Sequence, residues 1–130
     1  MKNPNSSFRR LSGITSALFF VLTLIWMFFP EKALTGWGVE YSEAAGLVSR
    51  RAAAIYAGLC VMFWLVRNSP PSPARYAMSS GLITACLIIA IDGLMGFYTG
   101  RANSGILVAV FIEIALAISH IKIGISFRRK

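Results

Sequence analysis

Four long runs of apolar residues divide this chain, and they constrain its fold more than any other feature. They cover residues 11–29, 52–66, 77–98 and 105–121. An α-helix rises about 1.5 Å per residue and the hydrocarbon core of a bilayer is about 30 Å thick, so a spanning helix needs roughly 17 to 20 residues. Three of the runs reach this length directly. The second does so if its helix begins near Glu43, which places Arg50 and Arg51 inside the span.

The composition agrees with membrane spans. Hydrophobic residues make up 56% of the 130 residues and charged residues only 14%, a poor fit to a soluble domain of this size. We therefore expect one all-α membrane domain over residues 1–130, folded as a four-transmembrane-helix bundle. The expected spans are residues 11–29, 43–66, 77–98 and 105–121.

The residues that flank the runs indicate where the helices end. Pro30 cannot continue a helix and disfavours helical geometry in the residue before it, so the first span should stop there. Ser42 followed by Glu43 is a plausible N-cap and first turn for the second span, and Ser104 is expected to cap the fourth. The proline-rich residues 68–73 should form a short, stiff connector.

The positions of the basic residues decide how to interpret the net charge of +8. In a soluble protein, clustered Lys and Arg would indicate binding to nucleic-acid phosphates. In the four-span arrangement, nine of the 13 basic residues lie on one side: Lys2, Arg9, Arg10, Arg67, Arg75, Lys122, Arg128, Arg129 and Lys130. This positive-inside pattern predicts cytoplasmic termini and excludes nucleic acid as the expected partner. The compact, short-looped form is typical of a bacterial inner-membrane protein.

Two acidic residues, Asp92 and Glu113, fall inside predicted spans, where an ionisable group costs several kcal/mol unless it is paired or solvated. Small residues surround each of them at helical spacing, which lets helices approach closely and predicts that both carboxylates face protein. Around Glu113 these are Gly105, Ala109 and Ala117, and around Asp92 they are Gly81, Ala85 and Gly96.

The helical rise places Arg51, Asp92 and Glu113 within one layer of the outer leaflet. We predict a buried network in which Arg51, with Arg50 or Arg101, holds both carboxylates. Two interpretations of this network stay open. It can be structural, fixing the register of the helices, or it can be a site that binds a small polar ligand or exchanges protons.

Residues that support conventional catalysis are missing from the sequence. Cys60 and Cys86 lack a C-x-x-C spacing and are expected to be small buried residues. His120 is the single histidine and is expected at the inner interface rather than as a haem ligand. We predict no cofactor, no metal and no enzymatic activity, with a subunit of a quinone- or lipid-linked enzyme as the weaker alternative.

Several short features occur in a characteristic order between Ser49 and His120. They are Arg50-Arg51 leading into Ile55-Tyr56-Ala57-Gly58-Leu59, the pair Asp92-Gly93, then Arg101 and Asn103, and finally Glu113. In this order the chain resembles a family of small bacterial four-helix inner-membrane proteins that is loosely similar to the DoxX-like group. The resemblance implies the four-helix fold. DoxX-like relatives also suggest an association with membrane redox systems, but no cofactor residue in this sequence supports it.

These observations predict an accessory or structural inner-membrane protein that packs against other membrane proteins or against copies of itself. The chain is small, lies almost wholly within the bilayer and lacks a catalytic set of residues. The alternative is a small transporter, or a ligand- or proton-binding membrane protein, that uses Arg51, Asp92 and Glu113.

Overall fold

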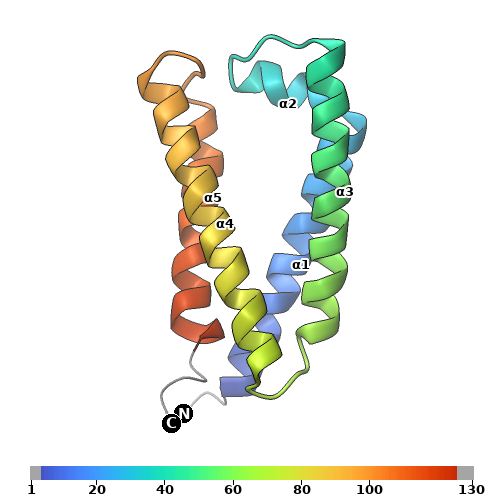
Figure 1. Ribbon diagram of the computed structural model, residues 1–130, viewed down its shortest axis with the longest axis vertical. Helices are drawn as coiled ribbons and strands as arrows, with labels where there is room; N and C mark the ends of the chain where they lie inside the picture. The colour runs from blue at the N-terminus through green and yellow to red at the C-terminus, as the bar shows by residue number, and fades with distance from the viewer. Residues whose placement is uncertain (1–3, 126–130) are drawn as a thin grey trace.

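The regular secondary structure in the described part of the chain is entirely helical. A computed structural model describes residues 4–125 (Figure 1). Its elements are α1 (Pro4–Phe28), α2 (Pro30–Gly36), α3 (Glu43–Val66), α4 (Pro73–Tyr98), α5 (Ile106–Ser119) and the π-helical turn η1 (His120–Gly124). Among these residues, four helical segments are long and apolar enough to cross a membrane: Asn5–Phe28, Glu43–Val66, Pro73–Tyr98 and Ile106–Gly124. The fold is therefore all-α, with four candidate membrane spans.

The helix boundaries follow from local chemistry, with one correction. Helix α1 ends just before Pro30, which itself opens the short helix α2, an element that the sequence did not predict. The Ser42 hydroxyl accepts a hydrogen bond from the backbone N–H of Ala45 at 3.1 Å, so Ser42 caps α3 as predicted. The prediction that Ser104 caps the last span is wrong, because no side chain caps α5. The nearby Gly105 N–H instead donates a hydrogen bond to the Asn103 side chain at 2.8 Å.

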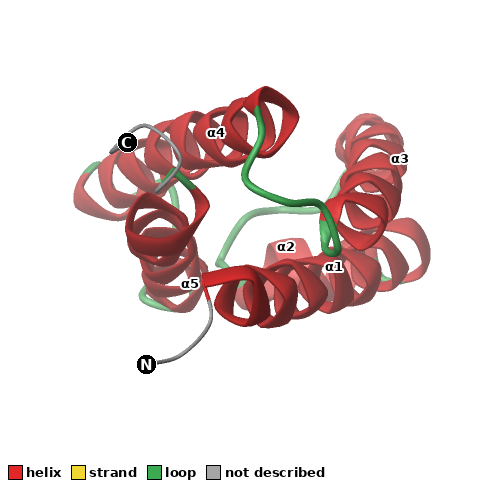
Figure 2. Cartoon of the chain, turned by 90° about the horizontal axis from the view of Figure 1, so that it is seen from below, coloured by secondary structure: helices red, strands yellow, loops and turns green. Residues whose placement is uncertain are grey.

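The four long helices form two hairpins. Helix α1 packs along α3, and α4 packs along α5, whereas the two pairs make far fewer contacts with each other (Figure 2). The hairpins converge where α1 begins and η1 ends, and they diverge toward the other end of the molecule (Figure 1). We call these the narrow end and the wide end. The α3–α4 connection lies at the narrow end, and α2 lies across the wide end.

The apolar core joins all four long helices. It consists of Phe8 and Phe19 of α1, Phe63 and Val66 of α3, Leu82 and Cys86 of α4, and Ala117 of α5. The Phe19 ring stacks on Phe63 and on Tyr56, with centroid separations of 6.3 and 5.8 Å. Aromatic pairs of this kind contribute about 0.5–1.5 kcal/mol beyond the burial of their area, so they stabilise the α1–α3 hairpin.

A second contact closes the wide end. Trp37, just after α2, packs on Trp26 of α1 with ring centroids 5.1 Å apart. The Trp37 carbonyl accepts a hydrogen bond from the backbone N–H of Asn103, in the α4–α5 turn, at 2.7 Å. Gly38 follows with a φ of +73°, which lets the chain turn away directly after this contact. The two hairpins are thus tied together at both ends.

Most of the apolar surface faces outward. In an apolar stretch of 18 residues from each candidate span, only 17% to 28% is buried inside the structure. Large side chains such as Ile55, Leu65, Ile88 and Phe111 are exposed. An exposed apolar surface of this extent is expected of a protein whose surroundings are lipid tails or other membrane helices.

Gly93 provides a test of the close α4–α5 contact. A Cβ atom at Gly93 would lie 2.7 Å from Cγ2 of Val110, whereas nothing lies within 4 Å of the corresponding position at Gly58. We expect Gly93→Leu to destabilise the protein by about 1–3 kcal/mol through overpacking, and Gly58→Leu to leave its stability nearly unchanged. Thermal unfolding of both variants in detergent, followed by circular dichroism, measures the difference. Equal unfolding temperatures would contradict this packing.

Candidate functional site

A cluster of buried polar side chains joins the two hairpins at the narrow end. Ser12 and Thr15 come from α1, Arg75 and Ser79 from α4, and His120 opens η1. None of the five side chains is more than 2% exposed. A buried polar group without a hydrogen-bond partner costs about 1–3 kcal/mol. Thr15 and Ser79 have such a partner in His120, whereas the Ser12 hydroxyl has none among the described residues.

His120 is the centre of this cluster. Its Nε2 lies 3.1 Å from Oγ1 of Thr15, and its Nδ1 lies 3.3 Å from Oγ of Ser79. A neutral imidazole has one N–H and one lone pair, so one of the two hydroxyls accepts from the neutral ring and the other donates to it. Phe63 packs edge-on against the ring at 5.3 Å. The imidazole thus touches α1, α3 and α4 at once.

Helix α5 passes into the π-helical turn η1 at His120. A π-helical turn is rare and commonly marks a functional or strained site in a helix. Gly124, at its end, lies so close to α4 that an added Cβ would be 2.6 Å from the Cβ of Ser79. The absence of a side chain at Gly124 therefore allows η1 to pack against α4 next to the histidine.

Arg75 brings a buried positive charge into the cluster. It is 2% exposed, its guanidinium lies 3.7 Å above the ring of Phe8, and its Nη2 donates to the Ile123 carbonyl at 3.0 Å. Its Nε and Nη1 have no hydrogen-bond partner among the described residues. The cation–π contact compensates part of the desolvation of the cation.

Two members of this cluster do not lie where the sequence predicted them. His120 was expected at an interface but is fully buried, because it lies on the same face of its helix as Ala117, which is also buried. Arg75 was expected to be a topology charge in a loop but lies in the first turn of α4. The hydroxyls inside the first and third spans, Ser12, Thr15 and Ser79, were the available signal, since polar side chains within a span need partners.

The predicted network of outer-leaflet charges is not formed in the structure. Arg50, Arg51, Asp92 and Arg101 are all exposed, and within residues 4–125 none of them forms an ion pair with an acidic side chain. Arg101 instead donates from Nε to the Thr99 hydroxyl at 2.9 Å. The physical reason is the rotation of α4, which turns Ala90 and Gly93 to the buried face and leaves Asp92 on an exposed side of the helix.

Glu113 faces protein, as the small-residue spacing predicted. It is half-buried on the face of α5 that also carries the buried Val110 and Ala117. It lies close enough to Tyr56 of α3 and Cys86 of α4 to interact with them electrostatically. Its Oε2 is buried without a hydrogen-bond partner among the described residues. Glu113 is therefore an interior carboxylate between the hairpins, separate from the exposed charges.

The remaining chemistry of the described residues is limited. Within residues 4–125, no three His, Cys, Asp or Glu side chains come together as ligands for a metal ion. Cys86 is buried and Cys60 is half-buried, and both are free thiols. The Cys60 carbonyl accepts a hydrogen bond from the Ser16 hydroxyl at 2.8 Å, which ties α3 to α1.

Comparisons of the chain with protein-family models, with curated proteins and with solved structures find no match. The similarity to the DoxX-like group stays a prediction from the sequence, because no result of these comparisons bears on it.

A double-mutant cycle tests whether His120 holds the hairpins together. We expect Thr15→Val and His120→Leu to destabilise the protein by about 1–3 kcal/mol each, since each leaves a buried partner unsatisfied. Together they should show a coupling energy of about 0.5–3 kcal/mol in detergent unfolding experiments. Thr23→Val is the control, because Thr23 bonds only within α1, to Phe19 O at 2.7 Å. Additive effects of Thr15→Val and His120→Leu would show that the contact contributes nothing.

Proposed function

We propose that the chain is a structural subunit of a bacterial inner-membrane assembly, with both termini in the cytoplasm and its outer helix faces packed against neighbouring membrane helices. The observation that carries this proposal is the exposure of Asp92 on a candidate membrane span. A carboxylate that faces lipid is costly, and contact with another helix relieves the cost. The basic residues gathered at the narrow end support the cytoplasmic placement of that end.

The outer face of α4 has the composition of a helix-packing surface. Ala77, Gly81, Ala85 and Asp92 are all exposed and follow one another at intervals close to whole helical turns. Nothing lies within 4 Å of the position that a Cβ would take at Gly81. Small residues at this spacing let a second backbone approach closely.

The outer face of α3 is complementary to it. Arg51, Ala54 and Gly58 are exposed and follow one another at intervals of three and four residues. A Cβ at Gly58 would also have no neighbour within 4 Å. This face therefore combines small residues with a positive charge, where the face of α4 combines them with a negative one.

The two charges lie at matching depths. Asp92 is six residues from the end of α4 at Tyr98, about 9 Å along the helix, and Arg51 is eight residues from the start of α3 at Glu43, about 12 Å. Both helix ends lie at the wide end of the molecule. Two copies with the same orientation in the membrane can thus pack α3 of one against α4 of the other, with Arg51 beside Asp92. A second copy is the partner that this surface fits best.

Charge exchange tests this assembly. We expect Asp92→Arg and Arg51→Asp each to lower the oligomeric fraction more than tenfold, because each places like charges together in a low-dielectric contact. The double variant should regain assembly, since it restores the pair in reverse. Chemical cross-linking in native membranes and mass measurement in mild detergent report the oligomeric state.

Arg101→Asp is the matched control, because Arg101 is exposed at the same end but outside both faces. It should assemble like the unmodified protein. Assembly that survives both single reversals contradicts packing of copies through these faces. A complex with another membrane protein that requires Asp92 but tolerates Arg51→Asp would support the structural role, with that protein as the partner instead of a second copy.

A proton- or ligand-binding role is the second candidate, and Glu113 favours it. Its Oε2, which has no hydrogen-bond partner within residues 4–125, lies between the hairpins, and His120 follows seven residues later on the same helix face. The two are about 10 Å apart along the helix axis. Carboxylates and histidines inside membrane spans commonly belong to ion or proton pathways.

The substitution Glu113→Gln separates this role from a structural one. The amide keeps the size of the side chain and can still form hydrogen bonds, but it cannot exchange a proton. If Glu113 binds protons, pH-driven uptake into vesicles that contain the purified protein should fall at least tenfold, with normal protein levels. Asp92→Asn should retain the uptake. Normal uptake in Glu113→Gln together with loss of the protein in Glu113→Ala indicates a structural role alone.

A further inference from the structure

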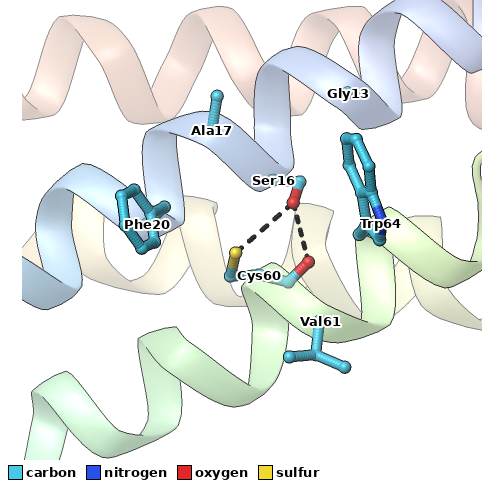
Figure 3. Close-up of a pocket in the computed structure, with 7 residues that line it drawn as sticks. All are labelled: Gly13, Ser16, Ala17, Phe20, Cys60, Val61 and Trp64. Carbon is cyan, nitrogen blue, oxygen red and sulfur yellow. Dashed lines mark hydrogen bonds between the residues drawn. The ribbon is translucent and has the colours of Figure 1, made fainter.

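A groove runs along the outside of the α1–α3 hairpin. In its apolar part, shown in Figure 3, Gly13 and Ala17 form one wall and Val61 and Trp64 the other, with Phe20 toward the wide end. The Ser16 hydroxyl bonds across it to the Cys60 carbonyl and so holds the two walls together. The volume of this part is about 370 Å³, within the range of small-molecule sites, roughly 300–1,000 Å³.

The groove continues toward the narrow end into a basic mouth. A part of about 730 Å³ shares Gly13, Ala17 and Trp64 with the apolar part and is also lined by Arg9, Arg10 and Arg67. Beyond it, Arg9 and Arg67 line a smaller hollow together with Asn68 and Ser69 of the α3–α4 connection. The groove is therefore amphiphilic, with its charged part at the ends of two candidate membrane spans.

No acidic side chain neutralises this mouth. The five acidic residues of the chain are Glu31, Glu40, Glu43, Asp92 and Glu113. The first three lie around α2 and the start of α3, at the wide end, and the other two lie within α4 and α5. The positive charge of Arg9, Arg10 and Arg67 is thus available to an anion.

The guanidinium of Arg67 is fixed in place. It stacks on the Trp64 ring, with its central carbon 3.4 Å from the ring centroid, and Nη1 donates to the Trp64 carbonyl. An arginine whose plane is held by an aromatic ring loses less freedom when it binds a phosphate. Trp64 in turn lines the apolar part, so one residue connects the charged and apolar halves of the groove.

We propose that this groove binds an anionic phospholipid. The phosphate and headgroup would lie among Arg9, Arg10 and Arg67, and an acyl chain would run over Gly13 and Ala17. Basic pockets beside membrane helices bind acidic headgroups in this way, and the order of charge and apolar surface along the groove matches the order within a lipid. A water-soluble anion would use only the mouth and would leave the apolar part empty.

Gly13 gives the acyl chain its space. Nothing lies within 4 Å of the position that a Cβ would take there. A leucine at this position would fill the groove without disturbing the packing of α1 on α3. Gly13→Leu is therefore a blocking variant that leaves the basic mouth intact.

The test measures lipid retention by native mass spectrometry. The purified protein is titrated in detergent with phosphatidylglycerol or with phosphatidylcholine of the same acyl chains. We expect a clear preference for phosphatidylglycerol, and the double variant Arg9→Gln with Arg67→Gln should lower this preference by roughly 30-fold, about fivefold for each arginine. Gly13→Leu should reduce retention of phosphatidylglycerol although all three arginines remain.

Arg101→Gln and Gly36→Leu are the controls, because they remove a charge and fill a gap at the wide end, away from the groove. Both should bind like the unmodified protein, and circular dichroism should show all variants folded. Equal retention of the two lipids, or a preference that survives the double arginine variant, overturns the proposal. Competition by glycerol phosphate as effective as that by the intact lipid, or full retention in Gly13→Leu, shows an anion site without an acyl-chain groove and overturns it as well.

Discussion

The contact of His120 with Thr15 and Ser79 is the interaction on which the arrangement of the two hairpins depends. Each hairpin has its own apolar contacts, but membrane helices gain little from apolar packing alone, since lipid tails are equally apolar. Hydrogen bonds that are buried between helices select one arrangement of the helices more strongly. Any arrangement that breaks such a bond leaves unsatisfied polar groups in a medium without water. The imidazole reaches both α1 and α4, and it therefore fixes how the second hairpin sits on the first.

The charges of Arg51 and Asp92, toward the wide end, have no ionic partner within residues 4–125. The narrow end is joined by side chains, whereas the wide end is joined by α2 and the backbone contact between Asn103 and Trp37. Between these ties, α3 and α4 turn Arg51 and Asp92 outward, away from their own hairpin partners. A charge that is exposed on a membrane helix is stable only beside a counter-charge, a polar headgroup or water. The fold thus leaves the positive charge of Arg51 exposed on one hairpin and the negative charge of Asp92 exposed on the other.

The four spans and the all-α class were predictable, because length and apolarity alone decide them. The inward face of Glu113 was predictable too, since the small residues around it repeat with the helical period. The exposure of Asp92 was not predictable, because small residues lie on both sides of α4. Their spacing alone does not distinguish a helix face that packs within the chain from one that packs against another chain. The burial of His120 was hidden for a related reason: its partners, Thr15 and Ser79, lie 105 and 41 residues away in sequence.

Arginine residues have different roles at the two ends of the molecule. At the narrow end Arg75 is buried on Phe8, whereas Arg9 and Arg67 line an open groove, so arginine serves there both as a packing element and as a charge that faces outward. At the wide end Arg51 lies on a face of small residues where a helix can approach. The positive-inside rule counts every arginine equally, as a charge that determines orientation in the membrane. What distinguishes them is the surface beside each one: an aromatic ring, an apolar groove or a close-packing helix face.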